Sequence, residues 1–189
     1  RMFIEQPIFD DFVNQLVAAT ESLKVGDPAL DETQLGPMVS AAQREISESF
    51  VAEARDAGRD IRTGGERQGE HGFYLNPAVI TGVKTGDRAW CEEIFGPIVC
   101  LRPFTDESKM LGEVNDTNYG LSGSIWSSDL SRALRVARQV ESGVISINTH
   151  SSVHTEAPFG GFKRSGLGRD LGMSAMEACT EVKNIYVGE

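Results

Sequence analysis

The feature that most constrains the fold is an alternation of strand-like and helix-like segments across the middle of the chain. Short apolar stretches with the length of strands are separated by stretches with helical periodicity, in the order 98–104, 106–115, 123–126, 129–142 and 144–148. Strands joined by helices pair in parallel through right-handed crossovers. We therefore predict an α/β fold, with a largely parallel sheet and flanking helices.

The N-terminal half contributes further elements to this pattern. Pro7 suits the first turn of a helix that reaches about residue 23, and Ser40 and Gln43 have the spacing of a capping box before a second helix that Gly58 closes. Strand patterns lie at residues 2–5, 60–63 and 74–80. Residues 182–187 near the C-terminus also alternate like a strand.

A loop at residues 92–97 has the sequence Glu-Glu-Ile-Phe-Gly-Pro. The Gly-Pro turn fixes the backbone, so that a carboxylate and an aromatic ring project from a rigid segment. A carboxylate can accept hydrogen bonds from both hydroxyls of a ribose, and a ring can pack against a planar base. The other interpretation is a solvated glutamate beside a phenylalanine that anchors the core.

A second loop, residues 158–166, reads Pro-Phe-Gly-Gly-Phe-Lys-Arg-Ser-Gly. Its glycines and basic residues do not have the spacing of a P-loop, and no GxGxxG motif follows a strand here. We interpret these glycines as turn formers.

Motifs along nearly the whole chain resemble the C-terminal part of the NAD(P)-dependent aldehyde dehydrogenase superfamily. They are FDDFV at 9–13, LKVGDP at 23–28, LGPMVS at 35–40, EEIFGP at 92–97, NDTNYGL at 115–121, PFGGFKRSG at 158–166 and TEVK at 180–183. The resemblance begins just after the point where such enzymes carry their nucleophilic cysteine.

The resemblance implies a reaction of which this chain holds only a part. In the family a cysteine thiolate adds to the aldehyde, hydride passes to the nicotinamide of NAD or NADP, and an activated water hydrolyses the resulting thioester. By family order the nucleophile, the general base, the oxyanion amide and the dinucleotide-binding fold lie upstream of Arg1. We therefore expect no catalytic nucleophile or base in this chain, and no activity from the chain alone.

The resemblance assigns supporting roles to five further residues and to Asp170. Glu93 matches the carboxylate that binds the nicotinamide ribose, and Phe95 matches the ring beside the nicotinamide. The wall and variable lining of the substrate pocket correspond to Phe159, Ser151 and Val153.

Asp170 matches a position where many relatives have a glutamate that assists proton relay. The aspartate is one methylene shorter, so it is only a candidate for that role. The sequence Asn-Thr-His at 148–150 also occurs in some relatives that oxidise amino aldehydes.

The resemblance also predicts an assembly. We expect residues 1–178 to form part of the catalytic domain and residues 179–189 to form an oligomerisation strand that pairs with a neighbouring subunit, since an unpaired edge is a liability. The expected partners are a small-molecule aldehyde, further copies of the chain and an N-terminal cofactor domain.

Composition excludes several other classes of protein. A formal net charge of −10 disfavours nucleic acid and anionic membranes as partners. No apolar stretch has the length of a membrane span and no leader opens the chain, which favours a cytoplasmic location. The three cysteines form no CxxC pair, and His150 and His154 lie in a loop-like stretch, so we predict neither a disulfide framework nor a metal site.

Individual cysteines have separate interpretations. Cys91 precedes two glutamates, whose charges raise the pKa of a thiol, so we do not assign it as a nucleophile. We expect Cys100 and Cys179 to fill the core.

Two other functions remain open. The chain could be a free-standing, non-catalytic module that self-associates or binds a partner through the same scaffold. A relative acting on acyl phosphates or semialdehydes is a further possibility, although the PFGG and TEVK motifs favour the aldehyde-oxidising branch.

Overall fold

The computed structural model describes residues 1–150 and 153–189. The described chain divides into two compact units, Arg1–Asp106 and Glu107–Glu189. The boundary between them follows the longest strand, β4 (Ile98–Phe104). No helix in the described part of the chain is long and apolar enough to span a membrane.

A four-stranded sheet in the order β1-β4-β3-β2 forms the centre of the first unit. Its other strands are β1 (Met2–Glu5), β2 (Asp60–Thr63) and β3 (Ala78–Thr81). Strands β1 and β3 both pair with β4 in parallel, whereas β2 pairs with β3 in antiparallel orientation. The sheet is thus rich in parallel pairs, as predicted, with one antiparallel edge strand.

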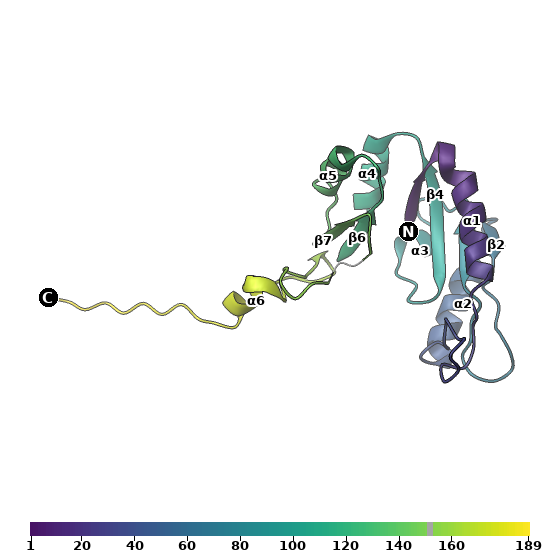
Figure 1. Cartoon of the computed structure of the whole chain (residues 1–189), viewed down its shortest axis with the longest axis horizontal. Helices are drawn as coiled ribbons and strands as arrows, with labels where there is room; N and C mark the ends of the chain where they lie inside the picture. Colours follow the sequence, from purple (N-terminus) through teal and green to yellow (C-terminus); the bar gives the residue numbers. More distant parts are fainter. Residues whose placement is uncertain (151–152) are drawn as a thin grey trace. The chain divides into compact units, whose positions relative to one another are not determined.

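Helices cover both faces of this sheet. They are α1 (Phe9–Glu21), which follows a 3-10 turn at Gln6–Ile8, α2 (Ala41–Asp56) and the short α3 (Arg88–Cys91). Phe9 and Val13 of α1 pack against Val79 and Leu101 on one face. Figure 1 shows α1 running alongside β4.

The second face carries the larger core. Phe50 and Val51 of α2 pack with Ile80 and Cys100 of the sheet and with Trp90 of α3. All four residues of β3 are buried, which is the pattern of a strand covered on both faces. Burial of these side chains supplies the main stabilisation of the unit, at about 1.5–3 kcal/mol for each large apolar side chain.

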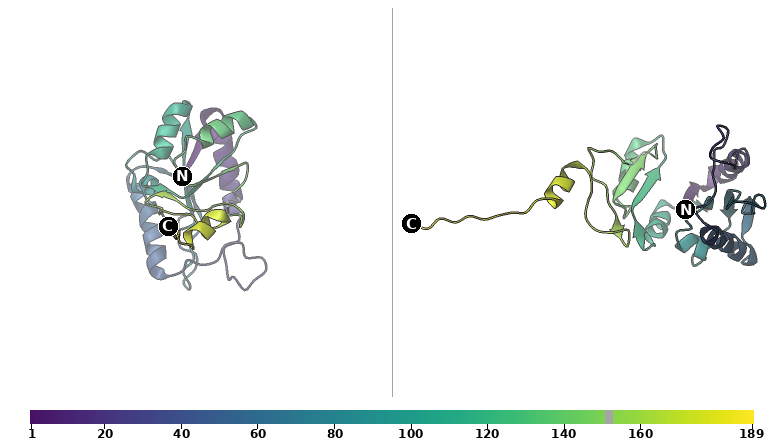
Figure 2. Two further views of the ribbon diagram at one scale, coloured as in Figure 1. Left: turned by 90° about the vertical axis from the view of Figure 1, so that its left-hand side faces the viewer. Right: turned by 90° about the horizontal axis from the view of Figure 1, so that it is seen from below.

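The second unit contains a βαβ crossover. Strands β6 (Ser122–Ile125) and β7 (Val144–Ile147) pair in parallel and are joined through α5 (Leu130–Ala137). The remaining elements are α4 (Glu107–Asn115), the short antiparallel pair β5 (Tyr119–Gly120) and β8 (Phe162–Lys163), and α6 (Gly172–Ala178). Figure 2 gives two further views of these elements.

Two predicted elements are shorter than expected. The predicted strand over 74–80 begins only at Ala78, because Leu75 instead bridges Arg67 in the preceding loop. The predicted helix over 129–142 ends at Ala137. Asn115 explains this early end, since its side chain donates to the carbonyl of Gln139 and accepts from the amide of Glu141, which turns the chain.

Residues 180–189 form neither helix nor strand in the single chain, and Figure 1 shows this segment continuing beyond α6. A strand needs a hydrogen-bonding partner, so the strand at 182–187 and the division into 1–178 and 179–189 stay predictions. Val182 and Val187 in this segment are almost fully exposed.

Candidate functional site

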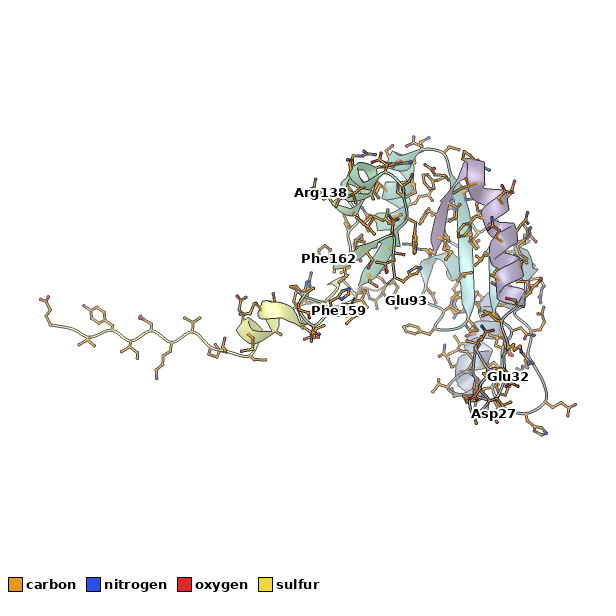
Figure 3. All side chains as sticks on the ribbon, viewed as in Figure 1. Asp27, Glu32, Glu93, Arg138, Phe159 and Phe162 are labelled. Atoms are coloured by element: carbon orange, nitrogen blue, oxygen red, sulfur yellow. The ribbon has the colours of Figure 1, made fainter. Side chains whose placement is uncertain are left out.

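The loop at residues 92–97 joins α3 to β4 and presents Phe95 to solvent. The Phe95 side chain is 74% exposed, while the preceding Ile94 packs against the core. The interpretation of Phe95 as a core anchor is therefore wrong. Glu93 is also exposed in this loop (Figure 3). The carboxylate and the ring are thus both accessible on the same short segment.

The backbone of Phe95 adopts an uncommon conformation. Its φ is +50°, in the left-handed region that residues other than glycine rarely occupy. Such a conformation costs about 1–3 kcal/mol and persists only when surrounding contacts hold it. Strained residues of this kind cluster at functional sites.

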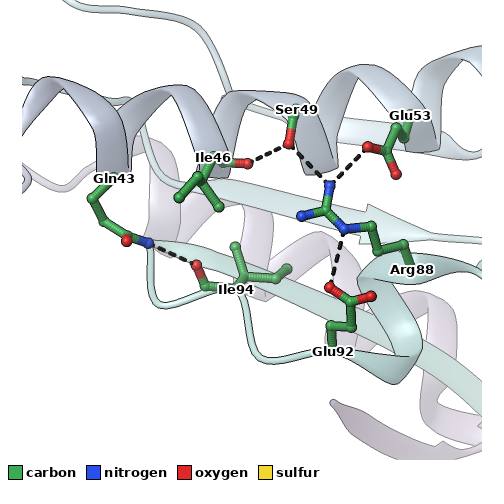
Figure 4. A network of polar contacts seen from close by, with 7 residues as sticks. All are labelled: Gln43, Ile46, Ser49, Glu53, Arg88, Glu92 and Ile94. Atoms are coloured by element: carbon green, nitrogen blue, oxygen red, sulfur yellow. Dashed lines mark hydrogen bonds and ion pairs between the residues drawn. The ribbon is translucent and has the colours of Figure 1, made fainter.

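Gln43 on α2 provides one of the contacts that hold the loop. Its side-chain amide donates to the carbonyl oxygens of Ile94 and Phe95, each at 3.2 Å. Ser40 caps α2 as predicted, because its hydroxyl accepts from the amide of Gln43 at 3.1 Å. The Gln43 side chain thus binds the loop, as Figure 4 shows for Ile94, while the backbone amide of Gln43 takes part in the cap.

Gly96 provides a second contact with α2. A Cβ atom at this position would overlap the hydroxyl and approach the Cβ of Ser47. Ser47 is fully buried on the face of the helix that meets the loop. The close approach of backbone to helix at this point therefore requires a glycine.

The two adjacent glutamates have different surroundings. Glu92 accepts a hydrogen bond from Nε of Arg88 at 3.0 Å, and Arg88 also bonds to Glu53 and Ser49 of α2 (Figure 4). Among the residues that the structure describes, none forms a hydrogen bond or ion pair with the Glu93 carboxylate. Glu93 is therefore the glutamate of the pair whose oxygens are available to a ligand.

The three cysteines lie in different surroundings. Cys100 is buried in β4 as predicted, and burial raises the pKa of its thiol to about 11. Cys179 is exposed, so its assignment to the core is wrong: the short helix α6 has no buried residue and offers no core to fill. Cys91 is exposed at the end of α3.

The described residues also contain no cluster of three or more His, Cys, Asp or Glu side chains that could hold a metal ion. His150 and His154 are not on a common helix. His150 instead lies beside Ser124 and Trp126, with its Nδ1 at 3.1 Å from the Ser124 hydroxyl.

The other predicted site residues lie in the second unit. Phe159 is partly exposed and pairs with Asp170 through two backbone hydrogen bonds, at 2.7 and 2.8 Å. Asp170 therefore lies in a bridge just before α6, which begins at Gly172. Val153 is 60% exposed, and Ser151 lies outside the described residues.

The glycine-rich loop is held by the pairing of β8 with β5 and by contacts of its own. Arg169 donates to the carbonyl oxygens of Gly161 and Gly168 at 3.0 and 2.6 Å, and its guanidinium lies over the ring of Phe162. Gly166 has positive φ, which agrees with its interpretation as a turn former, and Gly168 just beyond the loop has positive φ as well. A shallow depression of about 390 Å³ is lined by Glu141 and by residues between Gly161 and Arg169, but not by Phe159 or Val153.

Sequence reasoning missed the two residues that hold the first loop, Gln43 and Arg88. The spacing of Gln43 from Ser40 indicates a helix cap and gives no sign of the contact between Gln43 and the loop. Arg88 gave a weaker signal, since its i,i+4 spacing to Glu92 indicates an ion pair only if a helix is expected there.

The family model described as "Aldehyde dehydrogenase family" matches residues 1–185, nearly the whole chain. This chain belongs to the aldehyde dehydrogenase family. The fold agrees, because a solved aldehyde dehydrogenase from Bacillus cereus (E194S mutant) superimposes with a TM-score of 0.94 at 34% identity, over 98% of this chain and 38% of that one. The recognition of the family from its motifs is thus confirmed.

Curated aldehyde dehydrogenases with similar sequences include betaine aldehyde dehydrogenase 1 of Rhizobium meliloti (strain 1021). It is 40% identical over 191 residues, which cover all of this chain and 39% of that protein. The peroxisomal aminoaldehyde dehydrogenase 2 of Pisum sativum is 38% identical, again over the whole chain and 38% of its own length. This aldehyde dehydrogenase chain therefore spans about two fifths of these relatives.

A solved betaine aldehyde dehydrogenase from Staphylococcus aureus in complex with NAD+ is also similar. Its TM-score is 0.89 at 34% identity, over 93% of this chain and 36% of that one.

Proposed function

We propose that this chain forms the part of an NAD(P)-dependent aldehyde dehydrogenase that binds the nicotinamide ribose and lines the substrate pocket. The observation that carries the proposal is the loop at 92–97, whose backbone is bound to α2 by Gln43. It presents the exposed ring of Phe95 and the carboxylate of Glu93, which has no partner within residues 1–150 and 153–189. The family membership and the NAD+ complex of the S. aureus relative support the choice of cofactor.

Glu93 and Phe95 would hold the cofactor. The two oxygens of Glu93 can each accept a hydrogen bond from one ribose hydroxyl, and the Phe95 ring can pack on the nicotinamide face. When bound, the nicotinamide accepts hydride from the substrate. The role of this chain is to orient that ring and to exclude water beside it.

We further propose that the nucleophile, the general base, the oxyanion amide and the dinucleotide-binding fold belong to residues outside this chain. The chain spans 39% of the length of the R. meliloti relative, which supports the proposal that these groups lie in other parts of the protein. The burial and high pKa of Cys100 also make it unsuitable as a nucleophile. The isolated chain should then be inactive.

The substrate is proposed to be an aldehyde that carries an amino or quaternary ammonium group. The names of the R. meliloti and P. sativum relatives support this class, together with the Asn-Thr-His sequence at 148–150. Phe159, Val153 and Ser151 are the candidate lining residues. Asp170 stays a candidate for proton relay, and its exposed position in the bridge to Phe159 would let it exchange protons with water.

Assembly and location are parts of the same proposal. We propose that residues 182–187 pair with a second copy, since Val182, Ile185 and Val187 are at least 75% exposed and would be buried by pairing. We propose a cytoplasmic location, although the P. sativum relative is named peroxisomal.

A comparison of two proteins tests the proposed function. Betaine aldehyde and NAD+ are mixed with the 189-residue chain, and separately with the longer protein that contains it, and NADH is followed by absorbance. The proposal expects NADH only from the longer protein. NADH formation by the 189-residue chain, or none by a folded longer protein with any aldehyde, would contradict it.

The alternative is a free-standing module that self-associates without catalysis. The exposed apolar residues of the terminal segment favour this candidate as well, because they suit association whether or not the assembly is an enzyme. A gene that encodes only this chain, with self-association but no cofactor binding, would support the module.

A further inference from the structure

Arg88, the first residue of α3, makes four contacts with one guanidinium group. Nε donates to Glu92 at 3.0 Å, and Nη1 donates to Glu53 at 2.7 Å and Ser49 at 3.1 Å. The guanidinium carbon lies 3.9 Å from the centre of the Phe50 ring. Arg88 therefore connects Glu92, at the start of the 92–97 loop, to Ser49, Phe50 and Glu53 of α2. Figure 4 shows its contacts with Glu92, Ser49 and Glu53.

The position of Arg88 is itself fixed by its neighbours. Asp87 forms a bidentate ion pair with Arg59 at 2.7 and 2.9 Å, and also accepts from the backbone amide of Lys84. Two residues after Arg88, Trp90 is only 3% exposed in the core. Asp87 before Arg88 and Trp90 after it thus fix the short helix α3 in place. The backbone of Arg88 is therefore held, which limits the positions that its guanidinium can occupy.

This geometry separates the two adjacent glutamates. Without a cation beside them, Glu92 and Glu93 are like charges on neighbouring residues, and either could compete for the same ligand hydroxyls. Arg88 pairs with Glu92, while sharing its single charge with Glu53, and ties Glu92 toward α2. No described residue pairs with Glu93, so its carboxylate stays available.

We propose that Arg88 is a positioning residue for cofactor binding: by holding Glu92 against α2, it leaves Glu93 as the available carboxylate of the two glutamates and fixes the loop that carries Phe95. This inference rests on the proposed function of Glu93. It does not require Arg88 to touch the cofactor.

The contacts explain why the residue is an arginine. The planar guanidinium donates in several directions at once and stacks on Phe50, whereas a lysine ammonium is a compact point charge on a flexible stem. Arg88→Lys keeps the charge but cannot span Glu92 and Glu53 while it lies flat on the ring.

The test uses the longer protein that contains this chain and measures KM for NAD+ at saturating aldehyde. Arg88→Ala and Arg88→Lys are expected to raise KM about two- to fivefold, with little change in kcat. Arg55→Ala is the matched control, because Arg55 is also in an ion pair on α2, with Glu66 at 3.4 Å, but does not contact the loop. It should leave KM unchanged.

The double variant Arg88→Ala/Glu92→Gln separates positioning from general damage to the fold. If Arg88 acts by pairing with Glu92, then removing the Glu92 charge that Arg88→Ala leaves unpaired should bring KM for NAD+ most of the way back to the wild-type value. An equal KM for the single and double variants would overturn the inference, and so would a KM for Arg88→Ala equal to that of wild type.

Glu93→Gln distinguishes this inference from the proposed function. If Glu93→Gln leaves KM for NAD+ unchanged, the ribose-binding role itself fails. If Glu93→Gln raises KM and the Arg88 variants do not, only the positioning role fails. Amide hydrogen exchange of residues 93–95 in the 189-residue chain provides a second measurement, and exchange should be faster in Arg88→Ala than in Arg55→Ala.

Discussion

Gln43 and Phe95 lie 52 positions apart in the sequence, yet the side-chain amide of Gln43 donates to the carbonyl of Phe95 at 3.2 Å. The same amide donates to Ile94. At this contact the backbone of Phe95 is in the left-handed region, and its ring is exposed to solvent. A hydrogen bond from the first turn of α2 therefore holds the loop at Phe95, the residue whose backbone φ is positive.

Replacement of Gln43 by Ala should loosen the loop. Two hydrogen bonds are lost, so we expect the free energy of unfolding to fall by about 1–2 kcal/mol, measured by urea denaturation. Gln68→Ala is the control, because Gln68 also donates from its side-chain amide to a carbonyl, that of Val25, at a site away from the loop. Amide exchange at Phe95 should rise in Gln43→Ala alone, and equal exchange in both variants would argue against the clamp.

Gly96→Ala should destabilise the protein through overlap with Ser47. We expect a loss of about 1–3 kcal/mol, as for other overpacked sites, measured by thermal or urea unfolding. The double variant Gly96→Ala/Ser47→Ala removes the overlapping hydroxyl and should recover part of the loss.

Ser47→Ala alone supplies the control for this pair. The Ser47 hydroxyl is buried and has no hydrogen-bond partner among the described residues. Its removal should therefore be neutral or slightly stabilising. A marked loss of stability in Ser47→Ala would show that the hydroxyl has a partner which this account lacks.

The ion pair between Asp87 and Arg59 predicts how stability depends on pH. The hydrogen bond from Arg59 lowers the pKa of Asp87 in the folded state. The stabilisation is therefore fully present above the unfolded pKa of about 3.9 and is lost as the pH falls through the folded value. Asp87→Asn should reduce the difference in unfolding free energy between pH 7 and pH 3.

The matched control for this prediction is Asp31→Asn, because Asp31 is exposed in a surface loop. The difference in unfolding free energy between pH 7 and pH 3 should be the same for Asp31→Asn as for wild type. If Asp87→Asn retains the full acid-dependent loss of stability, the ion pair does not make the proposed contribution.

Removal of residues 179–189 should change the association of the chain. Pairing of the terminal segment with a second copy would bury apolar side chains that are now exposed, so the 1–178 protein should sediment as a smaller species than the full chain. Val187→Asp tests the same surface in the intact chain. Identical sedimentation of all three proteins at high concentration would exclude the segment from assembly.

The order of elements was predictable because periodicity is a local property. The strand at Met2–Glu5, the cap at Ser40 and the crossover through α5 each depend on residues close in sequence. Boundaries shifted where a distant side chain intervened, as Asn115 does at the end of α5. The wrong placement of Cys179 has a related cause, since apolar neighbours predict burial only when an element packs against them.

The candidate site was predictable in part. The motif at 92–97 and its resemblance to a family identified Glu93 and Phe95. The contacts with α2 that hold this loop join residues far apart in sequence: Gln43 and Phe95 are 52 positions apart, and Glu53 and Arg88 are 35 positions apart. No local pattern reports such contacts. The roles of Glu93, Phe95, Phe159, Val153 and Ser151 stay predictions.

The proposed binding of NAD+ by Glu93 is tested most directly by the KM for NAD+ of Glu93→Gln and Glu92→Gln in the longer protein that the proposed function expects to contain this chain. Loss of a charge-assisted hydrogen bond predicts an increase of about 10- to 100-fold for Glu93→Gln. Glu92→Gln should change KM by less than about twofold, because Glu92 is engaged by Arg88. Equal KM values for the two variants, or a larger effect of Glu92→Gln, would contradict the account.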